Sequence, residues 1–211
     1  MSIAATCLLE LNHPRVEFER YADDIVVHCA TKEKAIELLE QIRGRMAEIG
    51  LCLHPEKTRI VYCNQGRKPL KDEHISFDFL GFTFRPRVAK KTNGDLFIGF
   101  GPAISNKAKK RIRAELRALH IPRRADLSLE EIAWTLNRKL IGWYNYYGKF
   151  KPYQLCVLWR AINAQLCRWA RRRYKQFRYN LRKYLRWIRS VHRRNPKLFA
   201  HWQWYGPTEW G

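Results

Sequence analysis

The sequence predicts an α+β fold in which antiparallel strands with one helix are followed by an all-α region. Alternating or β-branched runs, which are typical of strands, lie within residues 1–104. Apolar residues at helical spacing dominate residues 105–211. The charge changes at the same point, because the first region holds 15 Lys and Arg against 14 Asp and Glu, and the second holds 26 against 5. We therefore expect two domains, residues 1–104 and residues 105–211.

The overall composition indicates a globular protein with a polyanionic partner. Hydrophobic residues make up 46% of the 211 residues and charged residues 28%, which excludes a disordered chain. The formal net charge of +22 is typical of proteins that bind nucleic acid. No apolar run approaches the length of a membrane span, so we expect a cytoplasmic protein without membrane contact. The six cysteines form no CxxC pair and predict reduced thiols: Cys7, Cys29, Cys52, Cys63, Cys156 and Cys167.

Two adjacent carboxylates, Asp23 and Asp24, stand at a turn between two apolar runs. Residues 16–20 alternate apolar and polar side chains, and residues 25–29 are β-branched and apolar, so both predict strands. A tight hairpin turn would place both carboxylates at its tip. Like charges side by side favour a bound cation, and carboxylate oxygens suit Mg²⁺. A solvated Asp-Asp turn is the alternative interpretation.

The rest of the first region predicts one helix and several strands. Thr31 is typical of a helix N-cap and Gly50 of a helix end, with apolar residues at helical spacing between them. Residues 1–15 predict the end of a helix and a turn, and residues 64–73 a polar, turn-rich connection. Strands are expected in three segments: residues 51–63 (two strands around a proline turn), 75–84 (with a bend at Gly81) and 96–100.

The second region predicts a series of helices. Ser128, followed three residues later by Glu131, predicts the capping box of a helix over about residues 129–147. Another helix is expected over about residues 107–119, after the Ser105-Asn106 cap. A third helix is expected after Lys151-Pro152, and it continues over residues 171–191 until Asn195-Pro196 ends it.

Tyr21-Ala22-Asp23-Asp24 resembles the YADD motif of reverse transcriptases encoded by bacterial and organellar group II introns. Further segments resemble that family in order over nearly the whole chain: residues 50–58 the next polymerase motif, residues 77–82 the primer-grip hairpin, and residues 142–147 and 195–202 the thumb or maturase domain. The resemblance implies part of a polymerase palm over residues 1–104 and a thumb/maturase domain over residues 105–211. It also implies a protein that binds intron RNA, assists its splicing and copies RNA into DNA.

The resemblance implies roles for three groups of residues. Asp23 and Asp24 would be catalytic residues that hold Mg²⁺ at the primer 3′-hydroxyl and the leaving pyrophosphate. Lys57 would be a further catalytic residue that stabilises phosphate charge or donates a proton. The residues that would position the primer are Tyr21, Leu80, Gly81 and Phe82. The alternatives are a surface lysine in a turn, ordinary hairpin packing, and a core strand with a bend.

Positive residues of the second region are interleaved with Trp and Tyr. Guanidinium groups bind phosphate and stack on bases, and aromatic rings stack on unpaired bases. The resemblance implies structured intron RNA as the partner, with DNA or an RNA–DNA duplex as a further contact. The expected RNA-binding residues are Arg168, Arg171, Arg172, Arg173, Lys175, Arg178, Arg182, Lys183 and Arg186. For any one of them, a solvated helix face is the alternative.

One departure from the family concerns the region before the YADD motif. A polymerase of this class needs a third carboxylate upstream and the fingers that bind template and nucleotide, and Glu10, Glu17 and Glu19 stand in no matching context. We therefore expect an incomplete Mg²⁺ site, no polymerase activity for the chain alone, and an N-terminal reverse-transcriptase portion supplied separately. Two alternatives remain open: a maturase-type splicing factor with a vestigial aspartate pair, and a non-functional remnant that still folds.

Overall fold

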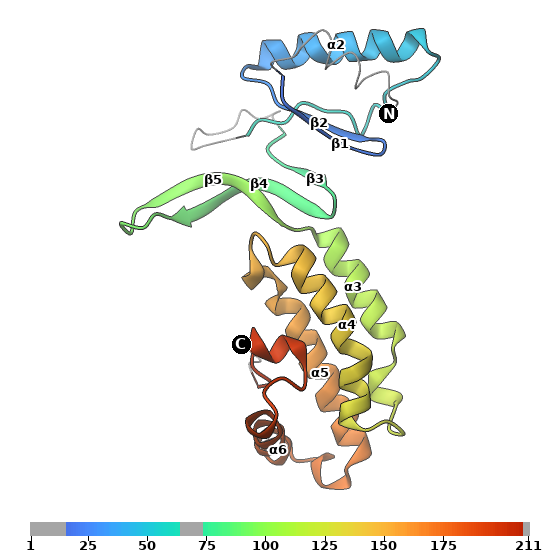
Figure 1. Cartoon of the computed structure of the whole chain (residues 1–211), viewed down its shortest axis with the longest axis vertical. Coiled ribbons are helices and arrows are strands. Elements are labelled where there is room, and N and C mark those ends of the chain that lie inside the picture. Colours follow the sequence, from blue (N-terminus) through green and yellow to red (C-terminus); the bar gives the residue numbers. More distant parts are fainter. Residues whose placement is uncertain (1–15, 64–73, 209–211) are drawn as a thin grey trace. The chain divides into compact units, whose positions relative to one another are not determined.

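The structure, a computed structural model, describes residues 16–63 and 74–208 (Figure 1). The helix end and turn expected in residues 1–15 and the connection expected in residues 64–73 lie outside the described residues. The chain divides into two compact units. The first unit comprises Met1–Phe79 and Phe84–Gly101, and the second comprises Leu80–Thr83 and Pro102–Gly211.

The first unit contains a hairpin covered by one helix. Strand β1 (Phe18–Tyr21) pairs with the antiparallel strand β2 (Asp24–Val27), as the sequence predicted. Helix α2 (Lys32–Glu48) packs on the hairpin through three buried side chains, and Figure 1 shows the two elements as neighbouring layers. The buried residues of α2 are Leu38, Ile42 and Met46, which contact Val16, Phe18, Ile25, Val27 and Leu53.

Both ends of α2 confirm the sequence prediction. The Thr31 hydroxyl accepts a hydrogen bond from the backbone N–H of Lys34 at 3.2 Å. At the other end Gly50 adopts a φ of +71°, and its N–H donates to Ala47 while the N–H of Leu51 donates to Met46. These two bonds form a Schellman motif, which requires a left-handed residue and therefore favours glycine.

A second sheet in the order β3-β4-β5 confirms the strands predicted for residues 75–84 and 96–100. Its strands are β3 (Phe77–Phe79), β4 (Phe82–Lys90) and β5 (Leu96–Ile104). The Phe77 ring stacks on Phe84 at 4.8 Å and on Phe100 at 6.1 Å, which fixes one face of the first unit's part of this sheet.

The two strands predicted within residues 51–63 were wrong. In the described part of the chain this segment holds a turn at residues 55–57 and one isolated bridge, between Val61 and His74. A β-branched run forms a strand only where a neighbour pairs with its backbone. Local composition therefore misled the prediction.

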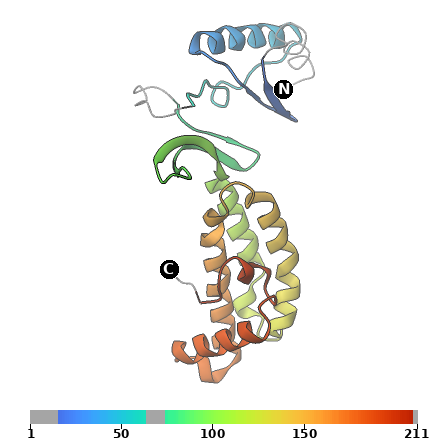
Figure 2. The same cartoon turned by 60° about the vertical axis from the view of Figure 1, so that its left-hand side comes forward.

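The second unit is a helical bundle in which α3, α4 and α5 run side by side (Figures 1 and 2). Its helices are α3 (Asn106–Ala118), α4 (Leu129–Tyr147), α5 (Cys156–Arg173) and α6 (Leu181–Arg194). Ser105 caps α3, and Ser128 with Glu131 forms the predicted capping box of α4. Fully buried side chains of the core include Ile112, Leu116, Leu136, Leu140, Leu158, Ile162 and Trp169. Every helix within the described ranges is too short or too polar to cross a bilayer.

The continuous helix predicted over residues 171–191 was also wrong. Helix α5 ends at Arg173, and α6 begins after Asn180, whose side chain accepts from the N–H of Lys183 at 2.9 Å. Between them Phe177 is buried, with its ring 5.1 Å from that of Trp187. Burying this aromatic side chain ends the straight course of α5, and the Asn180 cap allows a second helix to begin.

Two asparagines dock the C-terminal segment on the bundle. Asn137 of α4 donates to the carbonyl of Leu198 and accepts from the N–H of Ala200, both at 2.8 Å. Asn163 of α5, which is 1% exposed, donates to the carbonyl of Gly206 at 2.9 Å. Polar side chains in a core are retained where they satisfy backbone groups in this way. The segment is therefore an integral part of the bundle.

Asn163 also fixes the tautomer of the buried His201. Because the Asn163 amide nitrogen donates to a carbonyl, its oxygen accepts from His201 Nε2 at 2.8 Å. His201 Nδ1 is then the unprotonated nitrogen, and it is buried without a hydrogen-bond partner. Burial lowers the pKa of His201 from 6.5 to about 3.

This burial predicts an acid-sensitive fold. Below about pH 6.5 the unfolded chain gains a proton on His201, whereas the folded chain does not until about pH 3. The free energy of unfolding should therefore fall on acidification through this window, by at most about 1.4 kcal/mol per pH unit. Urea unfolding between pH 7 and pH 4 measures it.

His201→Gln is the matched variant, because a glutamine amide can still donate to Asn163 but does not titrate. The difference between the two pH slopes isolates His201 from the carboxylates. Equal slopes in the two proteins would contradict the assignment.

Candidate nucleic-acid interface and metal-binding hairpin

The predicted metal ligands lie at the tip of the β1–β2 hairpin. Ala22 and Asp23 form its two-residue turn, and Asp24 is the first residue of β2, paired with Tyr21. Ala22 takes a φ of +52°, as tight hairpin turns require at the first central position. The turn carbonyl of Ala22 accepts from Arg20 Nε at 3.2 Å. Both aspartates are exposed, and Tyr21 is 63% exposed.

The donor set of the hairpin suits a divalent cation that is shared with a substrate. Mg²⁺ is usually held by one or two carboxylates together with phosphate oxygens, and Asp23 with Asp24 supplies two adjacent carboxylates open to solvent. Residues 16–63 and 74–208 contain no cluster of three or more His, Cys, Asp or Glu side chains that could enclose a metal ion. Metal binding by the aspartate pair stays a prediction.

Lys57 lies in the same unit, at the turn that replaces the two predicted strands. Its N–H and that of Thr58 donate to the carbonyl of His54, at 3.2 and 2.9 Å. The Lys57 ammonium is exposed and forms no ion pair or hydrogen bond with a described residue, the two aspartates included. The proposed phosphate contact of Lys57 stays a prediction.

The residues predicted to position the primer form a tight turn between β3 and β4. Leu80 and Gly81 both have positive φ values, +49° and +79°, which is the signature of a type I′ hairpin turn. The carbonyl of Leu80 accepts from the Tyr146 hydroxyl at 2.9 Å, and that of Gly81 accepts from the N–H of Ser105 at 2.9 Å. This turn belongs to the helical unit.

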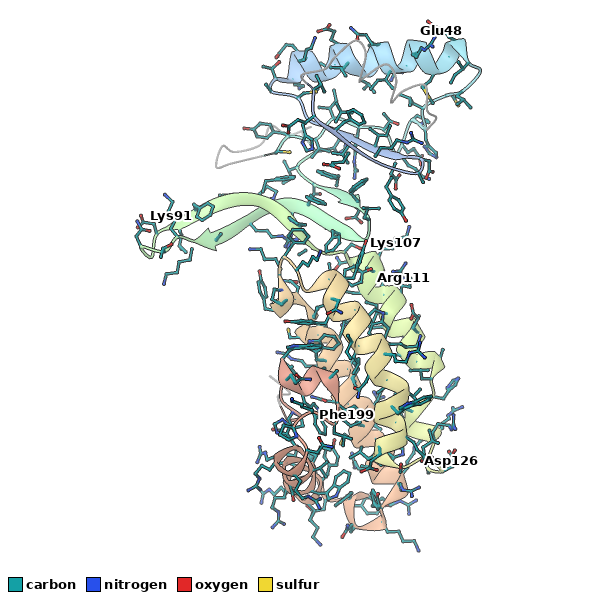
Figure 3. All side chains as sticks on the ribbon, in the orientation of Figure 1. Glu48, Lys91, Lys107, Arg111, Asp126 and Phe199 are labelled. Carbon is teal, nitrogen blue, oxygen red and sulfur yellow. The ribbon has the colours of Figure 1, made fainter. Side chains whose placement is uncertain are left out.

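Phe82 is enclosed by three aromatic side chains from α4 and the loop after it. Its ring centroid lies 5.4 Å from those of Tyr146 and Tyr147 and 5.5 Å from that of Phe150. Arg111, which projects from α3 beside the end of α4 in Figure 3, donates to the Tyr147 hydroxyl at 3.1 Å. Burial raises the pKa of Tyr147. Because the Phe82 ring is covered, a role in primer positioning would pass through the turn backbone.

All nine predicted RNA-binding residues are exposed, but they fall into two groups. Four of them donate to backbone carbonyls: Arg168 to Ala164, Arg171 to Arg178, Arg172 to Pro122 and Arg173 to Ala125. The last three of these arginines fasten α5 to the loops around it, whereas Arg168 donates within α5. Their role in the fold was absent from the sequence interpretation.

The other five cations extend into solvent without a hydrogen bond or ion pair to the described part of the chain. They are Lys175, Arg178, Arg182, Lys183 and Arg186. Side chains held by no described acceptor give up no such hydrogen bond when they turn to phosphate. These five are therefore the strongest part of the predicted RNA-binding surface.

The structure adds exposed groups that the sequence interpretation missed. Tyr179, in the loop between α5 and α6, is 90% exposed, and Trp134 on α4 is 75% exposed. Unpaired bases stack on rings of this kind. Further exposed cations are Lys107, Lys110, Arg113 and Arg117 on α3, and Arg193 and Arg194 at the end of α6. The charge count of the second region already contained this signal.

Gly81 gives a direct test of the turn. A Cβ at this position would lie 3.0 Å from the Tyr147 hydroxyl, in a left-handed backbone that alanine adopts only with strain. Gly81→Ala should lower the free energy of unfolding by about 1–2 kcal/mol.

Gly142→Ala is the matched control, since Gly142 lies inside α4 with no atom within 4 Å of an added Cβ. It should raise the free energy of unfolding by about 0.5–1 kcal/mol. Urea denaturation of both variants measures the difference, and shifts of the same sign would contradict the described turn.

Comparison with known families agrees with this arrangement of hairpin and helical unit. Residues 2–84 match the family described as "Reverse transcriptase (RNA-dependent DNA polymerase)". Residues 109–187 match the family described as "Group II intron, maturase-specific domain". A search of curated proteins gave no match. With a reverse transcriptase region followed by a maturase-specific domain, the chain belongs to the group II intron-encoded reverse transcriptase/maturases.

Proposed function

We propose that the helical unit of this reverse transcriptase/maturase holds folded intron RNA through the exposed cations of α6 and of the loop before it. The observation that carries the proposal is the charge of the second region, 26 basic against 5 acidic residues, with five predicted contacts left without a partner among the described residues. Such an excess of one sign destabilises the free protein through self-repulsion and stabilises a complex with phosphate. The maturase-specific domain match identifies intron RNA as the partner.

The same surface supports contact with an RNA–DNA duplex during synthesis. Cations on a helix face bind phosphate without reading sequence, so they accept either polynucleotide. Exposed rings such as Tyr179 add stacking on unpaired bases, which intron RNA supplies in loops and bulges. Structured RNA is therefore the expected main partner of this surface, and an RNA–DNA duplex is a second one.

For the hairpin, we propose that Asp23 and Asp24 hold Mg²⁺ together with phosphate oxygens of the nucleic acid and nucleotide. A bound Mg²⁺ supplies Lewis-acid chemistry at phosphoryl groups. The tight Ala22-Asp23 turn keeps the two carboxylates adjacent and open to a substrate. Lys57, with its ammonium free of described protein partners, would add positive charge beside the phosphates. Two adjacent carboxylates leave this site open to further ligands.

RNA affinity should depend steeply on salt. If about five cations contact phosphate, raising salt from about 50 to 200 mM should weaken binding about a hundredfold or more. Replacing Arg182, Lys183 and Arg186 together by glutamine should reduce the salt slope by about two to three. Filter binding or fluorescence anisotropy with a folded intron domain measures both quantities.

A triple variant on the first unit, with Arg85, Lys90 and Lys91 changed to glutamine, removes the same charge elsewhere. Salt-independent affinity, or equal slopes for the two triple variants, would contradict RNA binding by α6.

The aspartate pair should be separable from RNA binding. In a polymerase completed with the upstream reverse-transcriptase portion, Asp23→Ala and Asp24→Ala should remove Mg²⁺-dependent primer extension on an RNA template, and Mn²⁺ binding in the presence of primer and template. Both variants should bind intron RNA within about twofold of the unaltered chain, because the two aspartates lie in the first unit and the RNA-binding cations in the second.

Glu19→Ala, an exposed carboxylate on the same hairpin, is the control and should leave Mn²⁺ binding unchanged. Mn²⁺ binding that survives both aspartate substitutions would show that the metal proposal is wrong.

A further inference from the structure

Helix α6 crosses the end of the bundle at which α4 begins (Figures 1 and 2). Residues of both helices line a pocket there. Its volume is about 350 Å³, within the range of sites that take small organic groups. Its lining includes Leu129 and Glu130 of α4, Tyr174 from the loop after α5, and three residues of α6: Trp187, Val191 and Arg194.

The aromatic side of the pocket is rigid. The Trp187 ring lies 5.1 Å from Phe177, 5.6 Å from Tyr174 and 6.0 Å from Tyr184, and Phe177 and Tyr184 are buried. Trp187 itself is only half-buried, so part of its ring remains open. A flat ring held in place by its neighbours and open on one side is a platform for stacking.

The pocket is lined by two opposite charges that have no partner within residues 16–63 and 74–208. In the described part of residues 105–208 there are four acidic residues, and three of them are engaged: Glu115 with Lys139, Asp126 with Arg124, and Glu131 in the α4 capping box. Glu130 is the fourth, and it forms no ion pair or hydrogen bond with a described residue. Arg194 lines the same pocket, and its guanidinium forms no ion pair or hydrogen bond with a described residue either.

A carboxylate in so basic a unit is unfavourable for a polyanion unless it meets hydrogen-bond donors. Nucleobases supply such donors on their Watson–Crick edge, and RNA-binding proteins read splayed-out bases at this edge while stacking their faces. The exposed cations Lys183, Arg186 and Arg193 on the same helix would hold the flanking phosphates.

We propose that this pocket takes one unpaired nucleotide of the bound RNA. Its base stacks on Trp187, Glu130 accepts from donors on the base edge, and Arg194 binds the adjoining phosphate. Guanine fits best, because its edge presents two neighbouring N–H donors to the two oxygens of one carboxylate. The inference rests on the proposed RNA-binding function and adds a base-reading site to a surface that otherwise contacts phosphate.

The test uses the full 211-residue chain and RNA hairpins that are identical except for one bulged nucleotide. The bulge carries guanine, uracil or no base, and fluorescence anisotropy at fixed salt gives each Kd. The chain should bind the guanine bulge about tenfold more tightly than the abasic one. Glu130→Gln should reduce the preference for guanine over uracil. Arg194→Gln should weaken binding of the guanine and uracil hairpins more than binding of the abasic hairpin.

Arg193→Gln is the matched control, since it removes the same charge from the neighbouring position on α6. It should weaken all three hairpins equally and leave their ratios unchanged. Circular dichroism and thermal unfolding check that each variant is folded, which is expected because Glu130 and Arg194 are exposed.

Two outcomes would overturn the proposal, and they are distinguishable. Salt-dependent binding with equal Kd values for the guanine, uracil and abasic hairpins would remove the base-reading pocket and leave RNA binding by α6 intact. Failure to bind any hairpin at low salt would overturn the proposed RNA-binding function, and the pocket with it.

Discussion

The helical unit must fold against its own charge, and this constraint shapes most of what it contains. With 26 basic and 5 acidic residues in the second region, ion pairs cannot neutralise the surface. Stability comes instead from a dense apolar and aromatic core, in which Trp169 is fully buried and donates to the carbonyl of Arg124 at 2.9 Å. Arginines contribute through backbone carbonyls rather than carboxylates, as Arg171 does to Arg178 at 2.8 and 3.1 Å. A guanidinium used in this way stays charged and exposed, so the same residue supports the fold and attracts phosphate.

The parts of the fold that depend on local physics were predictable from the sequence. Helical spacing and caps gave α2 and α4 almost to the residue, because Thr31, Gly50 and Ser128 act on the few backbone groups next to them. The failures involve partners distant in sequence. Residues 51–63 form only one isolated bridge in the described chain, and Phe177 interrupts a run of good helix formers because Trp187 packs against it. Local pattern carries no information on either.

The candidate site divides in the same way. Asp23 and Asp24 at a hairpin tip follow from the strand pattern and the family resemblance, and the structure contains that hairpin. The contacts of Leu80 and Phe82 with Tyr146 could not be predicted, since they join residues more than sixty positions apart. These contacts hold the β3–β4 turn against the end of α4. A movement of α4 would therefore be transmitted directly to this turn.

Ala22 gives the β1–β2 hairpin a property that glycine would not. Its φ of +52° costs an alanine about 1–2 kcal/mol, and glycine would adopt the same angle without that strain. The methyl group also removes most of the alternative backbone conformations that glycine would allow at the tip. If the two aspartates share a cation, this restriction lowers the conformational entropy that is lost when the carboxylates converge on it. The strained turn thus exchanges folding stability for preorganisation of the ligands.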